Sequence, residues 1–411
     1  MNYALNKKVN VIGLGYIGLP TALMFAKNGV STVGTDYNAK LIENLNLRRL
    51  TFKEDGLEEL FAAALKNGVS FSVEYQKADF YIVAVPTPYA VSSKKMDPKY
   101  VISAVNSILD ICEKEAVIII ESTISPGTID KYIRPELIKR GLADVIRLVH
   151  APERIIPGKM VFELENNSRI IGADDRETGE LVKDLYSAFC KSEIVVTDIK
   201  TAEMTKVIEN TYRDVNIAFA NELAKICRYN GTDVYEIINI ANKHPRVNIL
   251  QPGPGAGGHC ISVDPWFLVG DYPDLTNLIL AARKVNDSMP AYVLSRLRTI
   301  MQNHKIADTS KIGLYGLSYK ENIDDPRESP TLQLLNKMSD HLASGIKVFD
   351  PFFKTKLVDC QFLDFSDFLK EIEIIVIMTA HDHIKENMDM IKNKIIFDTR
   401  NICEFDGVYK L

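Results

Sequence analysis

The chain has 411 residues, of which 46% are hydrophobic and 25% are charged, and its net charge at pH 7 is −5. These values are typical of a globular protein with about two or three domains, and they exclude a disordered or fibrous chain. Because an acidic chain presents no broad basic face, we expect neither nucleic acid nor a membrane surface among its partners.

The apolar runs are too short to cross a bilayer. The longest, such as residues 116–120 and 374–378, fall far below the roughly 20 residues of a membrane-spanning helix. The first residues pass directly into a strand without the apolar segment of a signal peptide, so we expect a cytoplasmic protein. The cysteines stand singly, in neither a disulfide framework nor a zinc-site spacing, and all are expected to be free thiols: Cys112, Cys190, Cys227, Cys260, Cys360 and Cys403.

Residues 1–198 alternate between short β-branched runs and amphipathic segments. This pattern predicts parallel strands joined by crossover helices, and runs that are apolar throughout indicate strands covered on both faces. We therefore expect an N-terminal Rossmann-type, doubly wound α/β domain. Its predicted strands lie in VNVIGLG, STVGTD, ADFYIVAVPTP, AVIIIEST, DVIRLVHAPER, RIIGADD and EIVVTDI.

The pattern changes after residue 198. From Thr201, apolar residues recur at spacings of three and four over a long predicted helix that ends at Gly231, and further helix is expected up to residue 303. We assign residues 199–303 to a central helical domain. Residues 304–411 return to alternation, with strands in KIGLYGLSY, GIKVFDP, EIIVIMTA and KIIFDTRN, and predict a smaller Rossmann-like α/β domain.

A glycine fingerprint follows the first predicted strand and opens a helix. In Gly13-Leu14-Gly15-Tyr16-Ile17-Gly18, the glycines allow a tight turn, close approach of a pyrophosphate and close helix packing. Asp36 ends the next predicted strand, where its carboxylate can accept hydrogen bonds from ribose hydroxyls and would repel a 2′-phosphate. The motif predicts NAD rather than NADP; the alternative is a glycine turn that binds no ligand.

The segment QPGPGAGGHCISVDPW, residues 251–266, is a poor helix or strand. Glycine is used where backbone takes unusual angles or approaches a ligand, so Cys260 at the end of this loop is placed to be exposed and reactive. The alternative, a small buried hydrophobe, is the expectation for the other five cysteines. Asp264 could orient a water or act as a base, whereas His259 is expected to be structural.

Six motifs, taken in order, resemble the UDP-glucose/GDP-mannose dehydrogenase family over essentially the whole chain. They are GLGYIGLP, ESTISPGT, APER, TAEMTKVIENTYRDVNIAFANE, PGPGAGGHCISVDPW and GLSYKENIDDPRESP. Within the family, HPRVNILQPGPGAGGHCISVDPWF and RDVNIAFANE are most similar to UDP-N-acetyl-D-mannosamine dehydrogenases, which serve the synthesis of surface glycans.

The resemblance implies a four-electron oxidation of a UDP-sugar CH2OH group to a carboxylate, with two NAD+ consumed per substrate. The implied substrate is UDP-N-acetyl-D-mannosamine, with UDP-N-acetylglucosamine or UDP-glucose as alternatives. A dehydrogenase that stops after one hydride and a catalytically silent nucleotide-sugar sensor are the competing functions. The resemblance also implies a homo-oligomer, a dimer or tetramer, with the long helix at its interface.

Catalytic roles carry over where the motifs match. Cys260 corresponds to the nucleophile that forms a thiohemiacetal and then a thioester, and Lys206 and Asn210 to the pair placed beside the reacting C6. Judged alone, that lysine and asparagine would be solvated helix residues. Asp264, Thr123 and Glu153 match further catalytic positions. Related glucose dehydrogenases carry a second glutamate where this chain has Pro157.

The resemblance implies further binding residues. Thr87, Thr123 and Arg327 are expected to contact the cofactor together with the fingerprint residues. The expected substrate contacts are Glu153, Arg154, Lys206, Asn210, Arg246, Gly257 and Lys320. By composition alone, Lys320 and Arg327 would belong to an exposed charge run. No metal is expected, because His381 and His383 lack carboxylates at ligand spacing.

Overall fold

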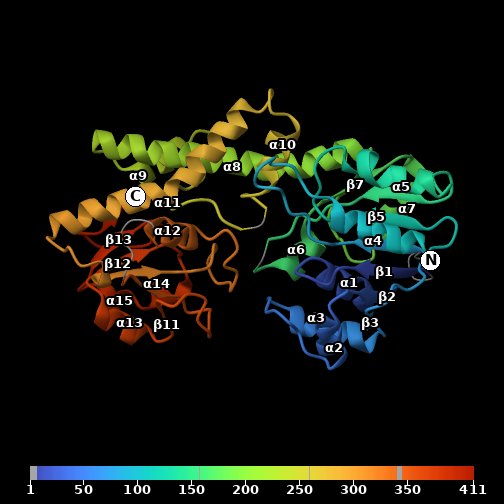
Figure 1. Cartoon of the computed structure of the whole chain (residues 1–411), viewed down its shortest axis with the longest axis horizontal. Coiled ribbons are helices and arrows are strands. Elements are labelled where there is room, and N and C mark those ends of the chain that lie inside the picture. The colour runs from blue at the N-terminus through green and yellow to red at the C-terminus, as the bar shows by residue number, and fades with distance from the viewer. Residues whose placement is uncertain (1–6, 157, 259, 340–344) are drawn as a thin grey trace. The chain divides into compact units, whose positions relative to one another are not determined.

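The computed structural model describes residues 7–156, 158–258, 260–339 and 345–411. The chain forms two compact units, residues 1–209 and 210–411, each with its own sheet (Figure 1). The α/β architecture predicted for both ends of the chain is confirmed.

The sheet of the first unit has the strand order β3-β2-β1-β4-β5-β6-β7-β8. All seven predicted strands are present, and the short edge strand β3 was not predicted. The bounds are β1 Lys8–Ile12, β2 Ser31–Thr35, β3 Ser70–Ser72, β4 Phe80–Val83, β5 Val117–Ile120, β6 Arg147–His150, β7 Arg169–Ala173 and β8 Ile194–Thr197.

One pairing departs from the expected parallel arrangement. Strand β7 pairs antiparallel with β6, whereas β7 and β8 pair in parallel. The chain leaves β6 at its carboxyl end and re-enters the sheet from that same end, so this pair needs no crossover along the sheet.

Helices flank this sheet, as Figure 1 shows in blue to green. The buried core joins strand residues such as Val11 and Ile119 to helix residues such as Leu23 and Phe61. The bounds are α1 Gly18–Lys27, α2 Ala39–Asn46, α3 Leu57–Lys66, α4 Lys99–Leu109, η2 Ile129–Ile133, α5 Arg134–Lys139, α6 Met160–Asn166 and α7 Arg176–Tyr186.

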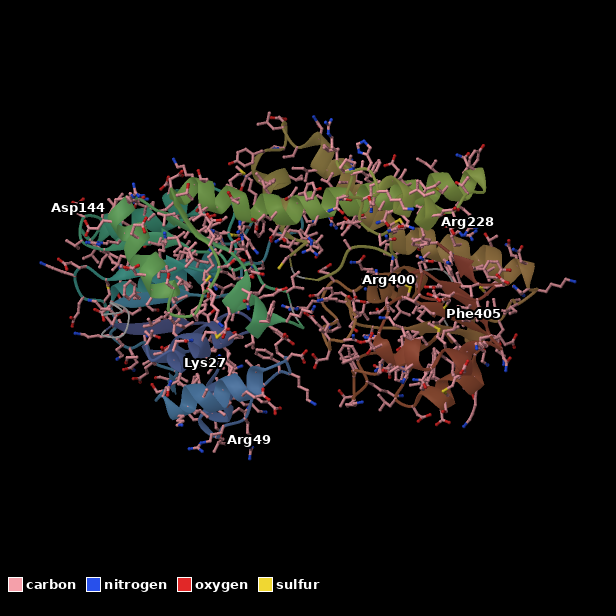
Figure 2. All side chains as sticks on the ribbon, turned by 180° about the vertical axis from the view of Figure 1, so that it is seen from behind. Lys27, Arg49, Asp144, Arg228, Arg400 and Phe405 are labelled. Carbon is pink, nitrogen blue, oxygen red and sulfur yellow. The ribbon has the colours of Figure 1, made fainter. Side chains whose placement is uncertain are left out.

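The predicted long helix is α8, Ile199–Asn230, and it ends where predicted. Gly231 takes the left-handed conformation with φ of +72°, which favours glycine. The amide of Thr232 donates to the Cys227 carbonyl at 2.9 Å, which caps an orphan carbonyl of the last turn. Arg228, labelled in Figure 2, donates to the Lys410 carbonyl at 2.5 Å and so ties this helix end to the C-terminal residues.

The second unit contains a parallel sheet of order β11-β10-β9-β12-β13-β14. The four predicted strands are present, and the two-residue edge strands β11 and β14 were not predicted. The strands are β9 Ile312–Tyr315, β10 Lys347–Phe349, β11 Gln361–Phe362, β12 Ile374–Ile377, β13 Ile395–Asp398 and β14 Tyr409–Lys410.

The helices of this unit include α11, which ends at residue 303 as predicted. Their bounds are α9 Val234–Ala241, α10 Asp264–Asp271, α11 Asn277–Asn303, η3 Thr309–Lys311, α12 Pro330–Ser339, α13 Phe365–Glu371, α14 Asp382–Glu386 and α15 Met388–Ile391. Of the helices in the described ranges, none has the length and apolar character that a membrane crossing requires.

Candidate active site

The glycine fingerprint forms a tight turn between β1 and α1. Gly13 has φ of +89°, and a Cβ there would lie 2.4 Å from the Ala84 carbonyl oxygen. A Cβ at Gly18 would lie 1.8 Å from the Gly13 oxygen, whereas one at Gly15 would meet nothing within 4 Å. The first and third glycines are therefore required by packing, and the middle one leaves open space where a pyrophosphate could approach the backbone.

Asp36 follows β2 directly and contacts this turn. Its Oδ2 accepts from the Leu14 amide and its Oδ1 from the Asn38 amide, both at 2.8 Å. The carboxylate is half-buried and keeps further acceptor capacity, as a ribose ligand requires. Tyr16 stacks on Phe52 with ring centroids 4.3 Å apart, and Ile17 precedes α1 as its N-cap residue.

Three other predicted residues follow neighbouring parallel strands. Thr87, Thr123 and Glu153 come after β4, β5 and β6. The carboxyl ends of parallel strands meet at one edge of the sheet, and the strand order reverses between β1 and β4, where such sheets bind their ligands. Ser122 Oγ donates to the Val85 carbonyl at 2.7 Å and so joins the segments after β4 and β5.

Lys206 and Glu153 form a buried ion pair within the first unit. Lys206 Nζ lies 3.5 Å from Glu153 Oε1, and both side chains are about 6% exposed. Glu153 Oε2 also accepts from the Ile155 amide at 2.6 Å. The expectation that Lys206, judged alone, is a solvated helix residue is wrong, because α8 turns this face toward the segment after β6.

Two titratable residues near this pair were not singled out from the sequence. His150 is fully buried, and its Nδ1 donates to the Ile120 carbonyl at 2.9 Å. Burial lowers the pKa of His150 to about 3, assisted by the charge of Lys206 and opposed by the hydrogen bond to Ile120, so the imidazole is neutral.

Glu203 is the second such residue, one turn before Lys206 on α8. Its carboxyl accepts from the Gly127 amide at 2.5 Å and from the Ile129 amide at 3.0 Å, which holds the turn before η2. Burial raises the pKa of Glu203 to about 7, against the opposing effect of these two amides. Its three-residue spacing from Lys206 was the available sequence signal, because residues so spaced share a helix face.

Arg154 is committed to contacts within its own unit. It forms an ion pair with Glu209 and donates from Nη1 to Ser168 Oγ at 2.9 Å. Any contact of this guanidinium with substrate would therefore compete with, or be added to, these bonds.

In the second unit, Cys260 is exposed, as predicted. The loop before it lies against the segment of residues 319–330. A Cβ at Gly257 would lie 2.7 Å from Tyr319 Cβ, and one at Gly258, whose φ is +85°, would lie 2.6 Å from the Tyr319 ring. The Gly258 amide donates to the Arg327 carbonyl at 3.1 Å. The glycines thus let this backbone pack directly on its neighbour.

None of the six cysteines forms a disulfide bond, as expected. The expectation that the other five are buried holds for Cys190, Cys227 and Cys403 but is wrong for Cys112 and Cys360, which are half-buried. The first follows the end of α4 and the second precedes the edge strand β11, where less structure covers a side chain.

Asp264 and Asn210 are paired and buried within the second unit. Asn210 Nδ2 donates to Asp264 Oδ2 at 2.6 Å. The predicted loop is shorter than expected, because α10 begins at Asp264 with Pro265 in its first turn. The amide of Asp264 donates to the Cys260 carbonyl at 2.9 Å, which fixes this carboxylate one turn from the thiol. The expectation of a solvated Asn210 is also wrong.

Arg283 is a further residue that sequence reasoning missed. It is fully buried on α11 and donates from Nη1 to Asp214 Oδ1 on α8 at 2.6 Å and to the Ile261 carbonyl at 3.4 Å. It therefore fixes the residue after Cys260 to two long helices. An arginine in an amphipathic helix gives no local signal of such burial.

The predicted basic residues of this unit differ in setting. Lys320 follows β9 and is half-buried, and Arg246 is exposed. Arg327 donates from Nε to Asp325 Oδ1 at 2.9 Å and from Nη2 to Oδ2 at 2.5 Å. Arg400, labelled in Figure 2, was missed: it follows β13, and its Nη1 lies 2.8 Å from where a Cβ at Gly253 would stand.

The hypotheses on Pro157 and His259 fall outside the described residues. Within the described ranges, no three or more His, Cys, Asp or Glu residues are grouped as metal ligands. His381 and His383 contact protein groups: the first lies 3.2 Å from Asp350 Oδ2 and the second 3.0 Å from the Tyr315 hydroxyl.

Three family models match the chain in succession. They are the NAD binding domain of the UDP-glucose/GDP-mannose dehydrogenase family at residues 7–190, its central domain at 200–288 and its UDP binding domain at 313–405. The chain belongs to this family. The predicted cofactor, NAD, is thereby confirmed, and the fingerprint turn, with its open approach at Gly15, fits it.

Similar proteins cover nearly the whole chain. A UDP-N-acetyl-D-mannosamine dehydrogenase from Methanocaldococcus jannaschii is 42% identical over 97% of this chain and 93% of its own length. An NDP-N-acetyl-D-galactosaminuronic acid dehydrogenase from Ralstonia nicotianae is 38% identical over 96% of both chains. The solved UDP-N-acetyl-mannosamine dehydrogenase Cap5O from Staphylococcus aureus is 40% identical, with a TM-score of 0.88 and 98% of each chain covered.

Proposed function

We propose that this enzyme oxidises UDP-N-acetyl-D-mannosamine to UDP-N-acetyl-D-mannosaminuronate. The observation that carries the proposal is the exposed Cys260 thiol beside the buried Asp264–Asn210 pair, because a thiol nucleophile can hold the intermediate aldehyde covalently while it is oxidised to the acid. The similar proteins named as UDP-N-acetyl-D-mannosamine dehydrogenases support the choice of sugar.

The reaction removes four electrons from C6. NAD+, when bound, accepts one hydride per molecule, so each substrate consumes two. In the first oxidation the C6 hydroxyl proton passes to a base, for which Lys206 or a water held by Asp264 is available, and C6 loses a hydride, which leaves an aldehyde. As an ammonium, Lys206 together with Asn210, one turn along α8, would stabilise the oxyanion that forms at C6.

Cys260 acts in the second oxidation. Its thiolate attacks the aldehyde carbon and forms a C–S bond while the carbonyl oxygen takes a proton, which gives a thiohemiacetal. Loss of a hydride from this carbon leaves a thioester. Water then breaks the C–S bond, releasing the carboxylate and the thiol. Asp264 or Glu153 would activate that water, and comparing the rates of thioester hydrolysis in Asp264→Asn and Glu153→Gln identifies which one does so.

The test replaces the nucleophile. Cys260→Ser should lower uronate formation by at least about 10³-fold, as loss of a covalent nucleophile does, while NAD+ binding stays at the wild-type level. The measurement is the number of NADH formed per UDP-sugar consumed, two for the wild type. Cys360→Ser, at a half-buried thiol of the same unit, is the control. Wild-type uronate formation by the Cys260 variant would refute this mechanism.

The substrate is tested with a panel of nucleotide sugars. UDP-N-acetyl-D-mannosamine should give the highest kcat/KM, against UDP-N-acetylglucosamine, UDP-glucose and GDP-mannose. UDP-N-acetylgalactosamine joins the panel because one relative is named for a galactosaminuronic acid. Absence of NADH with every sugar would favour a catalytically silent sensor instead.

We also propose that the enzyme is a homodimer or a larger assembly of such pairs. Helix α8 exposes Ile208, Tyr212, Phe219 and Ile226, whose spacings of four, seven and seven place them in one apolar stripe. Tyr212→Glu combined with Phe219→Glu should reduce the mass in solution to that of one 46.2 kDa chain. Tyr100→Glu, at an exposed tyrosine on α4, is the control; an unchanged mass in the double variant would exclude this interface.

A further inference from the structure

Fully buried His381 contacts both ends of a five-residue loop, Ser318 to Asn322, that contains Lys320. Its Nδ1 accepts from the Asn322 amide at 2.9 Å. Its Nε2 lies 3.1 Å from Ser318 Oγ and 3.2 Å from Asp350 Oδ2. Phe352 stacks on the imidazole with ring centroids 4.8 Å apart, which holds the ring plane.

The contacts of His381 define its proton. A backbone amide can only donate, so Nδ1 must be an acceptor and carries no hydrogen. The proton of the neutral ring is therefore on Nε2, from which it is donated to Asp350 and Ser318. The side chain is thus an acceptor toward one end of the loop and a donor toward the other.

Other bonds hold the same two loop ends. The Ser318 amide donates to Asp350 Oδ2 at 3.0 Å, and Thr379 Oγ1 donates to the Ser318 carbonyl at 2.7 Å. Asn322 exchanges two bonds with Asp382, from its Nδ2 at 2.7 Å and from the Asp382 amide at 3.0 Å. Asn322 has φ of +62°, a conformation that costs an asparagine energy and is maintained only by such contacts.

The residues between Ser318 and Asn322 include the lysine that is expected to bind substrate. Lys320 is the predicted substrate contact, and Tyr319 packs against Gly257 and Gly258 of the loop before Cys260. The loop also follows β9 at the point where the strand order reverses between β9 and β12, which is where parallel sheets of this kind bind ligands.

We propose that His381 is a positioning residue that holds the Ser318–Asn322 loop, and with it Lys320, in the conformation that binds the diphosphate of the UDP-sugar. The inference rests on the proposed UDP-sugar substrate. It assigns the buried imidazole no contact with substrate and no proton transfer. Its action is through the Asn322 amide.

Two substitutions test the roles of the two ring nitrogens of His381 separately. His381→Asn keeps an acceptor oxygen near the position of Nδ1, whereas His381→Gln keeps a donor near Nε2 and loses the acceptor. Binding of UDP to each purified full-length variant is measured by calorimetry. We expect Kd to rise about tenfold for His381→Gln, as loss of one positioning hydrogen bond predicts, and less than about threefold for His381→Asn.

His383→Gln is the matched control, because within the described residues the His383 ring bonds to the Tyr315 hydroxyl and not to the loop. It should bind UDP as the wild type does. NAD+ affinity, measured without sugar, should stay constant in all variants. Faster hydrogen exchange of the Asn322 amide in His381→Gln, but not in His381→Asn, is the readout that a general loss of stability would not produce selectively.

Equal UDP affinity of His381→Gln and wild type, or equal weakening by both His381 variants, would overturn the inference. If His381→Gln does not fold, His381→Phe replaces it: this variant keeps a ring against Phe352, loses the acceptor for the Asn322 amide and should also weaken UDP binding. Unchanged binding by that variant would equally overturn the inference. Failure of the wild type to bind UDP would instead refute the proposed substrate class.

Discussion

The two sheets begin with the same structural device and use it differently. In the first unit, β1 leads into Gly13, with φ of +89°, and the Leu14 amide donates to Asp36 after β2 at 2.8 Å. In the second, β9 leads into Gly316, with φ of +100°, and the Leu317 amide donates to Asp350 after β10 at 2.7 Å. Strand, glycine, leucine amide and acid recur in the same order.

The difference lies in what else reaches the acid. Asp36 is half-buried and accepts from two backbone amides. Asp350 is buried and accepts from five donors among the described residues: the amides of Leu317, Ser318 and Phe352, the Ser318 hydroxyl and His381 Nε2. Where the first unit has Gly15, facing open space, the second has a serine that donates to the acid.

The number of internal donors distinguishes a binding carboxylate from a structural one. A carboxylate with five internal donors has little capacity left for ribose hydroxyls, whereas one with two retains it. Burial would raise the pKa of Asp350, but the hydrogen bonds from His381, Phe352 and Ser318 lower it below its usual value, so this acid remains ionised. In the second sheet, the glycine turn after β9 and the acid Asp350 therefore serve to hold the Ser318–Asn322 loop.

The largest expected effect is on stability, at Asp350. Asp350→Asn replaces an acceptor with an amide whose NH2 group faces N–H donors, and we expect a loss of about 3–5 kcal/mol of unfolding free energy. Chemical denaturation followed by fluorescence measures it. Asp36→Asn is the matched control and should cost less than about 1 kcal/mol. Equal losses of unfolding free energy in Asp350→Asn and Asp36→Asn would contradict the distinction between a structural and a binding carboxylate.

A smaller effect, on affinity, is expected at Asp36. Asp36→Ala should weaken NAD+ binding by about 10–100-fold, since it removes a charged acceptor worth about 1.5–3 kcal/mol, and should narrow the preference over NADP+ by removing the repulsion of a 2′-phosphate. Titration calorimetry with both cofactors gives the ratio. UDP binding should be unchanged. An Asp36→Ala variant with wild-type NAD+ affinity would show that this acid is structural as well.

The two buried histidines also differ in their contacts. His381 contacts Asn322, Ser318 and Asp350, whereas His150 forms one hydrogen bond within the described residues and has a pKa lowered to about 3 by burial. An unfolded histidine takes up a proton below about pH 6.5. Folded His150 stays neutral down to about pH 3, so its contribution to stability is complete above about 6.5 and is lost as the pH falls.

We therefore expect stability to fall by up to about 1.4 kcal/mol per pH unit below pH 6.5 on account of His150. His150→Gln cannot titrate and should flatten this dependence, even if its stability at pH 7 is lower. Thermal unfolding between pH 5 and 7.5 measures the slope, with exposed His244→Gln as the control. Identical slopes in wild type and His150→Gln would contradict the assignment.

The sequence alone predicted the repeated features of the fold. Long runs such as β5 and β12 and the helix α8 are encoded by local periodicity and end signals, and the fingerprint at Gly13 is encoded by spacing. Short edge strands such as β3 and β14 carry too few residues for a pattern. The antiparallel β6–β7 pair was missed because strand direction depends on where the connection re-enters the sheet.

Motif resemblance brought Cys260, Lys206 and Asp264 together as candidates, but it did not describe their surroundings. The burial of Lys206 against Glu153 and of Asn210 against Asp264 arises from contacts over more than 50 residues of sequence. The same is true of the five donors around Asp350, which distinguish it from Asp36. Local sequence patterns were enough to predict the two α/β units, the NAD motif and the position of the thiol. Those patterns did not predict which polar groups have all their hydrogen bonds within the protein and which keep capacity for a ligand, because desolvation and hydrogen-bond satisfaction depend on neighbours that are remote along the chain.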